Sequence, residues 1–137
     1  MKNSTTLIAT IGLFLFILSG FSPNLNANIQ VRWELLGSRQ VKFNLDRDEI
    51  IVTGQEGTFK SLQVRVKKSA INMHKMVIHF RDGSEQNVEL KDNFRAGSES
   101  RVIDLDGNNR VIQKVVFWYD TKNYKNRRAI VELWGRH

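Results

Sequence analysis

The chain has 137 residues, of which 41% are hydrophobic and 26% are charged, and its formal net charge at pH 7 is +7. This length suits one domain with a core of its own, and the excess of positive charge favours anionic partners. The sequence contains no cysteine, which excludes disulfides, thiol catalysis and thiolate metal sites.

The first 27 residues predict an export signal. Lys2 gives a basic start, an apolar run covers residues 7–18, and Leu25-Asn26-Ala27 offers a cleavage site with a small residue at its end. A membrane anchor is the alternative, but a span requires about 20 apolar residues, and no cysteine is present for acylation. We therefore expect residues 1–27 to be a signal peptide and residues 28–137 to form the exported domain, periplasmic or extracellular.

The exported domain keeps an excess of positive charge. Lys2 is the single charged residue of the signal, so 20 of the 21 basic side chains remain against 14 acidic ones. The expected partners are an anionic glycan, a lipid headgroup or another envelope protein, and neither nucleic acid nor an integral membrane span of the mature domain is expected. The alternative is that this charge only keeps the domain soluble, because basic and acidic residues are interspersed.

Strict two-residue alternation predicts strands with one buried face in four segments. The alternating apolar residues are Val41, Phe43 and Leu45; Leu62, Val64 and Val66; Met76, Ile78 and Phe80; and Val88 and Leu90. Turns are predicted at Gly37-Ser38, Asp46-Arg47-Asp48, residues 54–57, Asp82-Gly83, Ala96-Gly97-Ser98 and residues 106–109. The pattern predicts an all-β fold: a single antiparallel β-sandwich of eight or nine strands, of jelly-roll or Greek-key type, with little helix.

The sequence predicts neither catalysis nor metal binding. Residues 104–109 resemble part of a calcium loop, but no acid completes the pattern and Arg110 follows instead. Alternation puts His74 and His79 on opposite faces of one strand, where they cannot share a metal ion. We expect a non-enzymatic protein with no cofactor.

The last two predicted strands carry the strongest binding signal. Val115, Phe117 and Tyr119 alternate with Val116 and Trp118, so both faces of this strand are apolar. A hairpin with Tyr119 opposite Ala129 places Trp118, Ile130 and Trp134 on one outer face.

The loop between these strands adds Tyr124, Arg127 and Arg128 to the predicted face. Aromatic rings beside cationic groups suit sugar rings or acidic polymers. We therefore expect a module that binds an anionic or carbohydrate ligand of the envelope. One alternative is an exported structural or accessory protein that binds another protein through this hairpin, and another is that the segment around Trp33 covers the tryptophans.

Several short segments match one bacterial family. They are residues 33–37, 46–48, 57–59, 96–97 and 100–105, followed by Gly107, Arg110, Ile112, Phe117, Tyr119, Ala129, Val131 and Gly135. On these residues the chain resembles the YaaI-like family of small exported proteins, which carry a domain of unknown function. The resemblance covers nearly all of the predicted mature domain. It implies an exported all-β domain and brings no activity, substrate or site.

The most specific part of this match contains four charged residues. Arg101 and Arg110 flank Asp104 and Asp106 at neighbouring strand ends. Because a guanidinium binds a carboxylate in a forked geometry, these residues are predicted to form structural charge pairs that pin the Asp-Gly turn.

Overall fold

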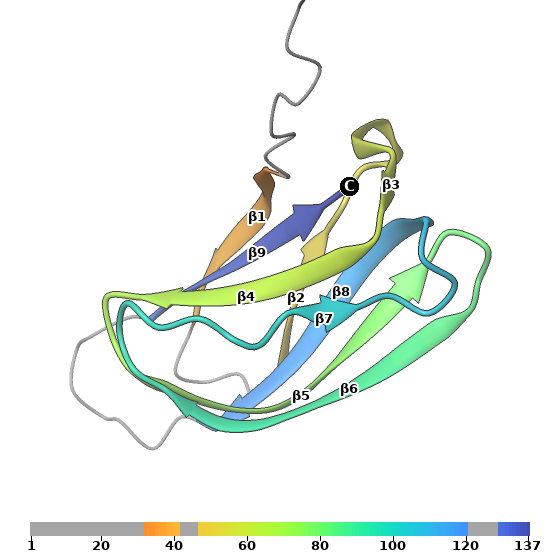
Figure 1. Cartoon of the computed structure of the whole chain (residues 1–137). Coiled ribbons are helices and arrows are strands. Elements are labelled where there is room, and N and C mark those ends of the chain that lie inside the picture. Colours follow the sequence, from red (N-terminus) through yellow and green to blue (C-terminus); the bar gives the residue numbers. More distant parts are fainter. Residues whose placement is uncertain (1–31, 42–46, 121–128) are drawn as a thin grey trace, which may run out of the picture. The chain divides into compact units, whose positions relative to one another are not determined.

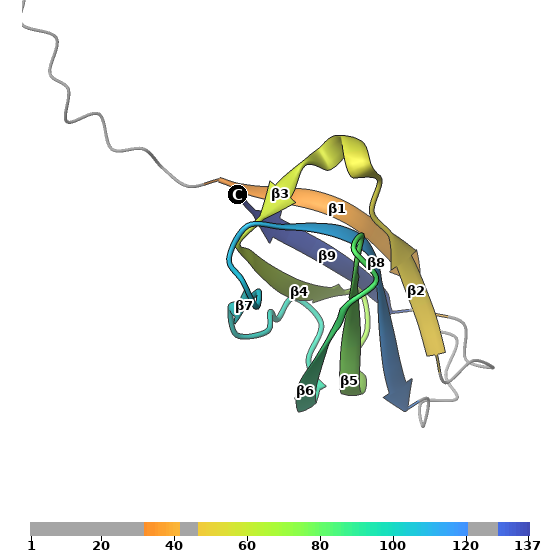
Figure 2. The same cartoon turned by 90° about the vertical axis from the view of Figure 1, so that its right-hand side faces the viewer.

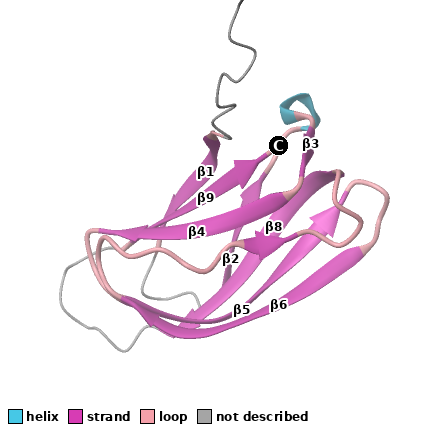
Figure 3. Cartoon of the chain, viewed as in Figure 1, coloured by secondary structure: helices cyan, strands magenta, loops and turns pink. Residues whose placement is uncertain are grey.

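The computed structural model describes residues 32–41, 47–120 and 129–137. Nine strands among these residues form two antiparallel sheets within the compact unit Val31–His137 (Figure 1). The described residues contain no α-helix, and the short 3-10 helix Gly54–Glu56 is coloured cyan in Figure 3. The all-β prediction is confirmed. No helix of this part of the chain is long and apolar enough to cross a membrane, and the predicted signal peptide lies outside the described residues.

The smaller sheet has four strands in the order β1-β9-β4-β7. Their bounds are β1 (Trp33–Gln40), β9 (Ile130–Arg136), β4 (Ser61–Lys67) and β7 (Ile103–Asp104).

The larger sheet has five strands, four of them in the order β2-β8-β5-β6, and β3 also pairs with β8. The bounds are β2 (Arg47–Ile51), β8 (Arg110–Asp120), β5 (Ile71–Phe80), β6 (Glu85–Phe94) and β3 (Thr58–Phe59). In these orders β9, β4, β8 and β5 each have a neighbour on both sides.

The two sheets share one buried hydrophobic cluster, to which alternate residues of both contribute. The alternating apolar residues of β4, β5 and β6 are all buried, as the sequence predicts: Leu62, Val64, Val66, Met76, Ile78, Phe80, Val88 and Leu90. Val41 is buried as well, whereas Phe43 and Leu45 lie outside the described residues. The period of two thus correctly identifies the inward-facing side chains.

Four of the predicted turns are present. Gly83 and Gly107 have φ values of 92° and 85°, which a residue with a side chain rarely adopts. The predicted hairpin at Asp82-Gly83 joins β5, which ends at Phe80, to β6, which begins at Glu85. The other two confirmed turns are at residues 54–57 and at Ala96-Gly97-Ser98.

The predicted turn at Gly37-Ser38 is wrong, and the one at Asp46-Arg47-Asp48 does not include Arg47 or Asp48. Gly37 and Ser38 lie inside β1, where the register shifts between Leu35 and Gly37. A Cβ atom on Gly37 would be 2.6 Å from Cγ2 of Ile50, so this glycine is required by the close approach of β2. Arg47 and Asp48 begin β2, and Asp46 lies outside the described residues.

The predicted hairpin between the last two strands is also wrong. β8 and β9 belong to different sheets: Trp118 is opposite Arg47 and Lys75, and Trp134 is opposite Leu35 and Gln63. The nine residues between the two strands exceed what a tight hairpin needs, so sequence adjacency does not force pairing.

Side chains connect the two sheets along both sides of the core. On one side, where Figure 2 shows β1 and β2 next to each other, Arg39 Nε donates to the backbone oxygen of Glu49 at 2.9 Å. On the other side, Gln86 Nε2 donates to the backbone oxygen of Asp104 at 3.0 Å, and the Asp106 N–H donates to Gln86 Oε1 at 2.9 Å. Strands β6 and β7 do not pair with each other. The Gln86 side chain therefore satisfies backbone groups of Asp104 and Asp106 that no neighbouring strand reaches.

Candidate functional site

The structure separates the residues of the predicted binding face. Ile130 and Trp134 lie on the outer face of the four-stranded sheet, whereas Trp118 lies on the outer face of the larger sheet. All three side chains are partly exposed. Tyr124, Arg127 and Arg128 lie outside the described residues. Trp118 and Trp134 therefore cannot contact one small ligand together.

Strand β1 brings new residues to the half of the face that contains Trp134. Leu35 is directly opposite Trp134, and Trp33 is opposite Arg136. Leu35 is 49% exposed, which is high for a large apolar side chain. We call this surface the tryptophan face and define it by Trp33, Leu35, Arg65, Ile130, Trp134 and Arg136.

A guanidinium lies over each indole of the tryptophan face. The Arg65 guanidinium is 4.1 Å from the ring centroid of Trp134, and that of Arg136 is 5.0 Å from the ring of Trp33. Both distances are within the range of cation–π attraction. Each pair spans two neighbouring strands, so sheet pairing fixes the order of rings and cations.

Hydrogen bonds hold these side chains in place. Trp134 Nε1 donates to Glu132 Oε1 at 3.3 Å, and Arg65 Nε donates to Gln63 Oε1 at 3.2 Å. Gln63 is buried, and its amide nitrogen donates in turn to the backbone oxygen of Ser100 at 3.1 Å. Arg65 is thus held by an amide that is itself fixed, and Trp134 is held by Glu132.

The two guanidinium groups differ in how far acids neutralise them. Arg65 Nε is 3.7 Å from a carboxylate oxygen of Glu99, whose side chain is 60% exposed. Arg136 Nη2 donates to the Ser61 hydroxyl at 3.2 Å, and within the described residues no carboxylate is at ion-pair distance from Arg136. Both cations can therefore accept a further anionic partner at little desolvation cost.

Trp118 has a different setting on the larger sheet. Its ring has Lys75 Nζ at 4.6 Å and the Arg47 guanidinium at 5.7 Å, from the strands on either side. Val116, on the same outer face, is fully buried beneath the surrounding long side chains. The apolar outer side of β8 is thus largely covered by its neighbours in the sheet.

Arg110 binds groups other than the predicted acids. Its Nη2 donates to Asp82 Oδ2 at 3.0 Å and to the Ser84 hydroxyl at 2.6 Å, while Nη1 donates to the backbone oxygen of Asp106 at 2.8 Å. The guanidinium also lies 3.7 Å from the ring centroid of Phe80. Arg110 therefore joins two Asp-Gly turns, at 82–83 and at 106–107, and its pairing with the carboxylates of Asp104 and Asp106 is wrong.

The other predicted charge pair is also absent. Arg101 Nη2 donates to the backbone oxygen of Glu89 at 2.9 Å, and Asp104 Oδ1 accepts from the Ser61 hydroxyl at 3.0 Å. Arg101, Asp104 and Asp106 thus have side-chain or backbone partners in β4 and β6. Arg110 instead contacts the turn at 82–84 and the backbone of Asp106.

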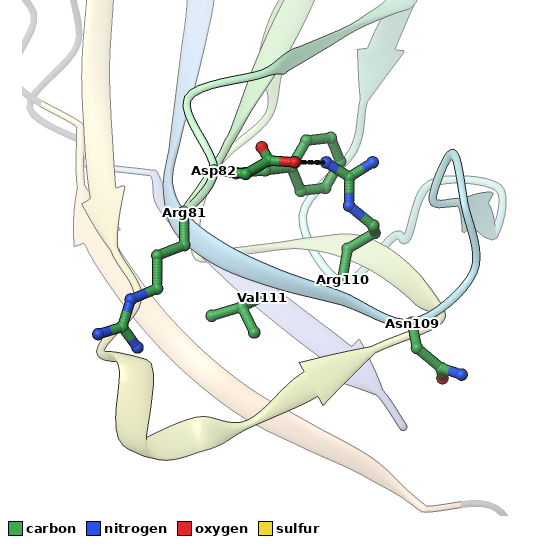
Figure 4. Close-up of a pocket in the computed structure, with 6 residues that line it drawn as sticks. Arg81, Asp82, Asn109, Arg110 and Val111 are labelled. Atoms are coloured by element: carbon green, nitrogen blue, oxygen red, sulfur yellow. Dashed lines mark hydrogen bonds and ion pairs between the residues drawn. The ribbon is translucent and has the colours of Figure 1, made fainter.

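A shallow pocket of about 320 Å³ lies beside Arg110 (Figure 4). Hydrogen bonds from Ser84 hold the pKa of the Asp82 carboxyl below its ordinary value, and Arg110 adds to this effect. In Figure 4 the Arg81 side chain points away from the Asp82–Arg110 pair. Arg110 already donates hydrogen bonds to three protein acceptors. We therefore interpret the residues around this pocket as structural and not as a ligand site.

The three histidines are dispersed, and no group of three or more His, Asp or Glu side chains among the described residues could hold a metal ion. His74 is exposed at a register shift of β5, and His79 Nδ1 is 3.3 Å from Glu85. Sequence reasoning missed His137, which follows β9 and has two close polar partners in the structure: the carboxylate of Glu34 and the backbone oxygen of Thr58. No local pattern points to these contacts, because both partners are distant in sequence.

By architecture, the described residues form an all-β domain with two antiparallel sheets. The chain belongs to the family described as "Domain of unknown function (DUF2541)", whose model matches residues 8–135. The expected membership in a domain-of-unknown-function family is thus confirmed. Among curated proteins, none matches this chain.

Proposed function

We propose that the protein is an exported, non-enzymatic β-sandwich domain that binds an anionic polymer of the cell envelope through the tryptophan face. The observation that carries the proposal is the pairing of Trp134 with Arg65 and of Trp33 with Arg136 around the exposed Leu35. Exposed apolar and aromatic side chains with cations at their edges favour ligand contact. Tyr124, Arg127 and Arg128 remain predicted contributors because they precede Ile130 in the sequence.

The stacking geometry favours an anionic ligand over a neutral sugar. A neutral sugar ring binds best on an uncovered indole face, but the Arg65 guanidinium occupies one face of Trp134 at 4.1 Å. A guanidinium held flat against an indole still presents N–H donors at its edge, where carboxylate or sulfate oxygens can bind. The positive net charge of the chain acts in the same direction.

A protein partner is the second candidate, and a specific observation favours it. β1 is an end strand of its sheet, and its Leu35 side chain is 49% exposed next to Trp33 and Trp134. Apolar side chains on an end strand suit contact with another chain. In that case neutral substitution of the two arginines would affect binding less than loss of the tryptophans.

Binding to a sulfated polysaccharide tests the proposal, with neutral dextran as the ligand control. The double variant Arg65→Gln/Arg136→Gln should bind at least tenfold more weakly and lose part of its salt dependence, because two screened attractions are removed. The matched control is Arg47→Gln/Lys75→Gln, which removes two cations beside Trp118 on the opposite outer face.

The comparison of the two double variants decides the outcome. Equal losses would mean that net charge alone drives binding and would reject the tryptophan face as the site. Unchanged binding by a folded Arg65→Gln/Arg136→Gln variant would reject it as well. Weaker binding to the polymer by Trp134→Ala, with intact folding, would support it further.

A further inference from the structure

His137 occupies a junction between three strands. It follows β9, its Nε2 atom is 3.0 Å from Glu34 Oε2 in β1, and its Nδ1 atom is 2.7 Å from the backbone oxygen of Thr58 in β3. Its ring also stacks on Phe59, with 4.5 Å between the ring centroids and 25° between the ring planes. The imidazole thus contacts both the polar backbone and the buried core.

These contacts define the protonation state of the ring. A carboxylate oxygen and a backbone carbonyl oxygen are both acceptors, so each ring nitrogen must donate a proton to form a hydrogen bond. Neutral imidazole carries one N–H group and can satisfy only one of the two partners. The imidazolium satisfies both, and deprotonation must break one of the bonds.

The junction lies next to the tryptophan face. Glu34 is between Trp33 and Leu35 in β1, and Arg136, which stacks over Trp33, immediately precedes His137. Thr58 belongs to β3, which pairs with β8 of the larger sheet. The imidazolium therefore ties the beginning of β1 to the other sheet at the point where β1 presents its tryptophan.

We propose that His137 is a protonation-dependent latch, which holds the beginning of β1 and so keeps Trp33 and Leu35 in the arrangement that binds the anionic ligand. This inference rests on the proposed function for its effect on binding, whereas the latch itself is independent of any ligand. Because Trp33 and Leu35 lie on either side of Glu34, release of Glu34 loosens both side chains at once.

The charged groups around the imidazole support this behaviour. The hydrogen bond with Glu34 raises the pKa of His137 above its ordinary value of 6.5, and the bond with Thr58 and the charges of Glu34 and Glu56 act in the same direction against partial burial. Glu34 comes from β1 and Glu56 from the 3-10 helix, and Arg136 is the neighbouring cation in the chain. Because the pKa is raised in the folded state, the latch is fully formed below pH 6.5 and is lost as the pH rises through the folded value.

A ligand-free experiment tests the latch. Nuclear magnetic resonance of the purified protein should show that the His137 imidazole titrates above 6.5, and hydrogen exchange should show β1 amides about tenfold less protected in His137→Gln, because one charged hydrogen bond is lost. His79→Gln is the matched control, since His79 also contacts a glutamate but lies on the other sheet. Titration at or below 6.5, or unchanged protection of β1, would overturn the proposal.

Binding to the sulfated polysaccharide then separates positioning from simple charge. If His137 contributed only its positive charge, Glu34→Gln would strengthen binding by removing a nearby negative charge. If the latch positions Trp33, Glu34→Gln should weaken binding severalfold at pH 6. The affinity of this variant for the polysaccharide should also no longer change as His137 is protonated or deprotonated. Strengthened binding would overturn the positioning role. If the ligand-free experiment shows the latch but the protein does not bind the polysaccharide, the proposed function is rejected and the latch is retained.

Discussion

Two glycines inside strands, Gly37 and Gly135, lie where neighbouring side chains leave no room for a Cβ atom. A Cβ atom on Gly135 would be 2.7 Å from Cδ1 of Leu36 and 2.8 Å from Cδ1 of the fully buried Phe59. Neither ring nor branched side chain can move freely in a packed core. Glycine is therefore required at position 135 by the lack of space for a side chain. At Gly83 and Gly107 it is required by the positive φ values of the turns.

Gly135→Ala should destabilise the protein by about 1 to 3 kcal/mol, the usual range for overpacking in a core. Urea unfolding followed by tryptophan fluorescence measures the free energy of unfolding. Gly54→Ala is a suitable control, because its new Cβ atom would meet the flexible end of Arg81 at 2.8 Å rather than core atoms. Equal effects of the two variants would contradict the packing role of Gly135.

At the scale of elements, strand β8 illustrates how a sequence pattern can be correct while the pairing inferred from it is not. Its inner residues Val115, Phe117 and Tyr119 are buried in the core, as the alternation predicts. Its outer residue Val116 is buried too, between its cross-strand partners Glu49 in β2 and Val77 in β5. The apolar outer side thus reflects a central position in the sheet more than a ligand surface.

Two neighbouring Asp-Gly turns, at residues 82–83 and 106–107, are connected by Arg110. Its forked guanidinium reaches Asp82 and Ser84 in one turn and the backbone of Asp106 in the other. Arg110→Lys keeps the charge but cannot serve these three acceptors in the same geometry. We expect the melting temperature to fall by a few degrees, measured by circular dichroism.

Arg101→Lys is the control for this prediction, because Arg101 is exposed and makes a single hydrogen bond to the Glu89 backbone. It should leave the melting temperature nearly unchanged. An Arg110→Lys variant as stable as the wild type would show that the fold does not need the connection between the two turns.

The carboxyl of Asp82 gives this region a pH dependence. Hydrogen bonds from Ser84 lower the pKa of Asp82 in the folded state. The ionised carboxyl therefore stabilises the protein above pH 3.8, the pKa of the unfolded state, and this stabilisation is lost as the pH falls through the folded-state pKa.

At the scale of the whole molecule, the proposed export would decide which partners the tryptophan face can meet. The family match covers residues 8–135 and so includes most of the apolar segment. Intact mass and N-terminal sequencing of the protein from the producing cell should show a chain that begins at Asn28. A cytoplasmic protein that retains Met1 would contradict export.

Without cysteine, the domain must be stable without disulfides. One hydrophobic cluster shared by both sheets provides this, and the side-chain bonds of Arg39 and Gln86 connect the sheets at their edges. A small exported domain more often relies on disulfides. Here the size of the domain allows a core large enough to replace them.

The candidate site was predictable only in part. Ile130 and Trp134 share an outer face because they are four residues apart in one strand, and alternation alone shows this. Trp33 and Leu35 join them through the pairing of β1 with β9, which connects residues about a hundred positions apart. The sequence predicts Trp118 on the same face because it predicts a hairpin of the last two strands. The pairing of β8 with β2 and β5 places Trp118 on the other sheet.

The sequence by itself determined the all-β class, the buried residues of β4, β5 and β6, and four of the turns. Alternation and the conformational demands of Gly83 and Gly107 are local properties, so a short segment contains all the information they need. The tertiary structure alone decided which strands pair, what Arg110 binds and where His137 lies. These depend on backbone hydrogen bonds and side-chain contacts between distant segments, which form only when the two sheets close over a common core.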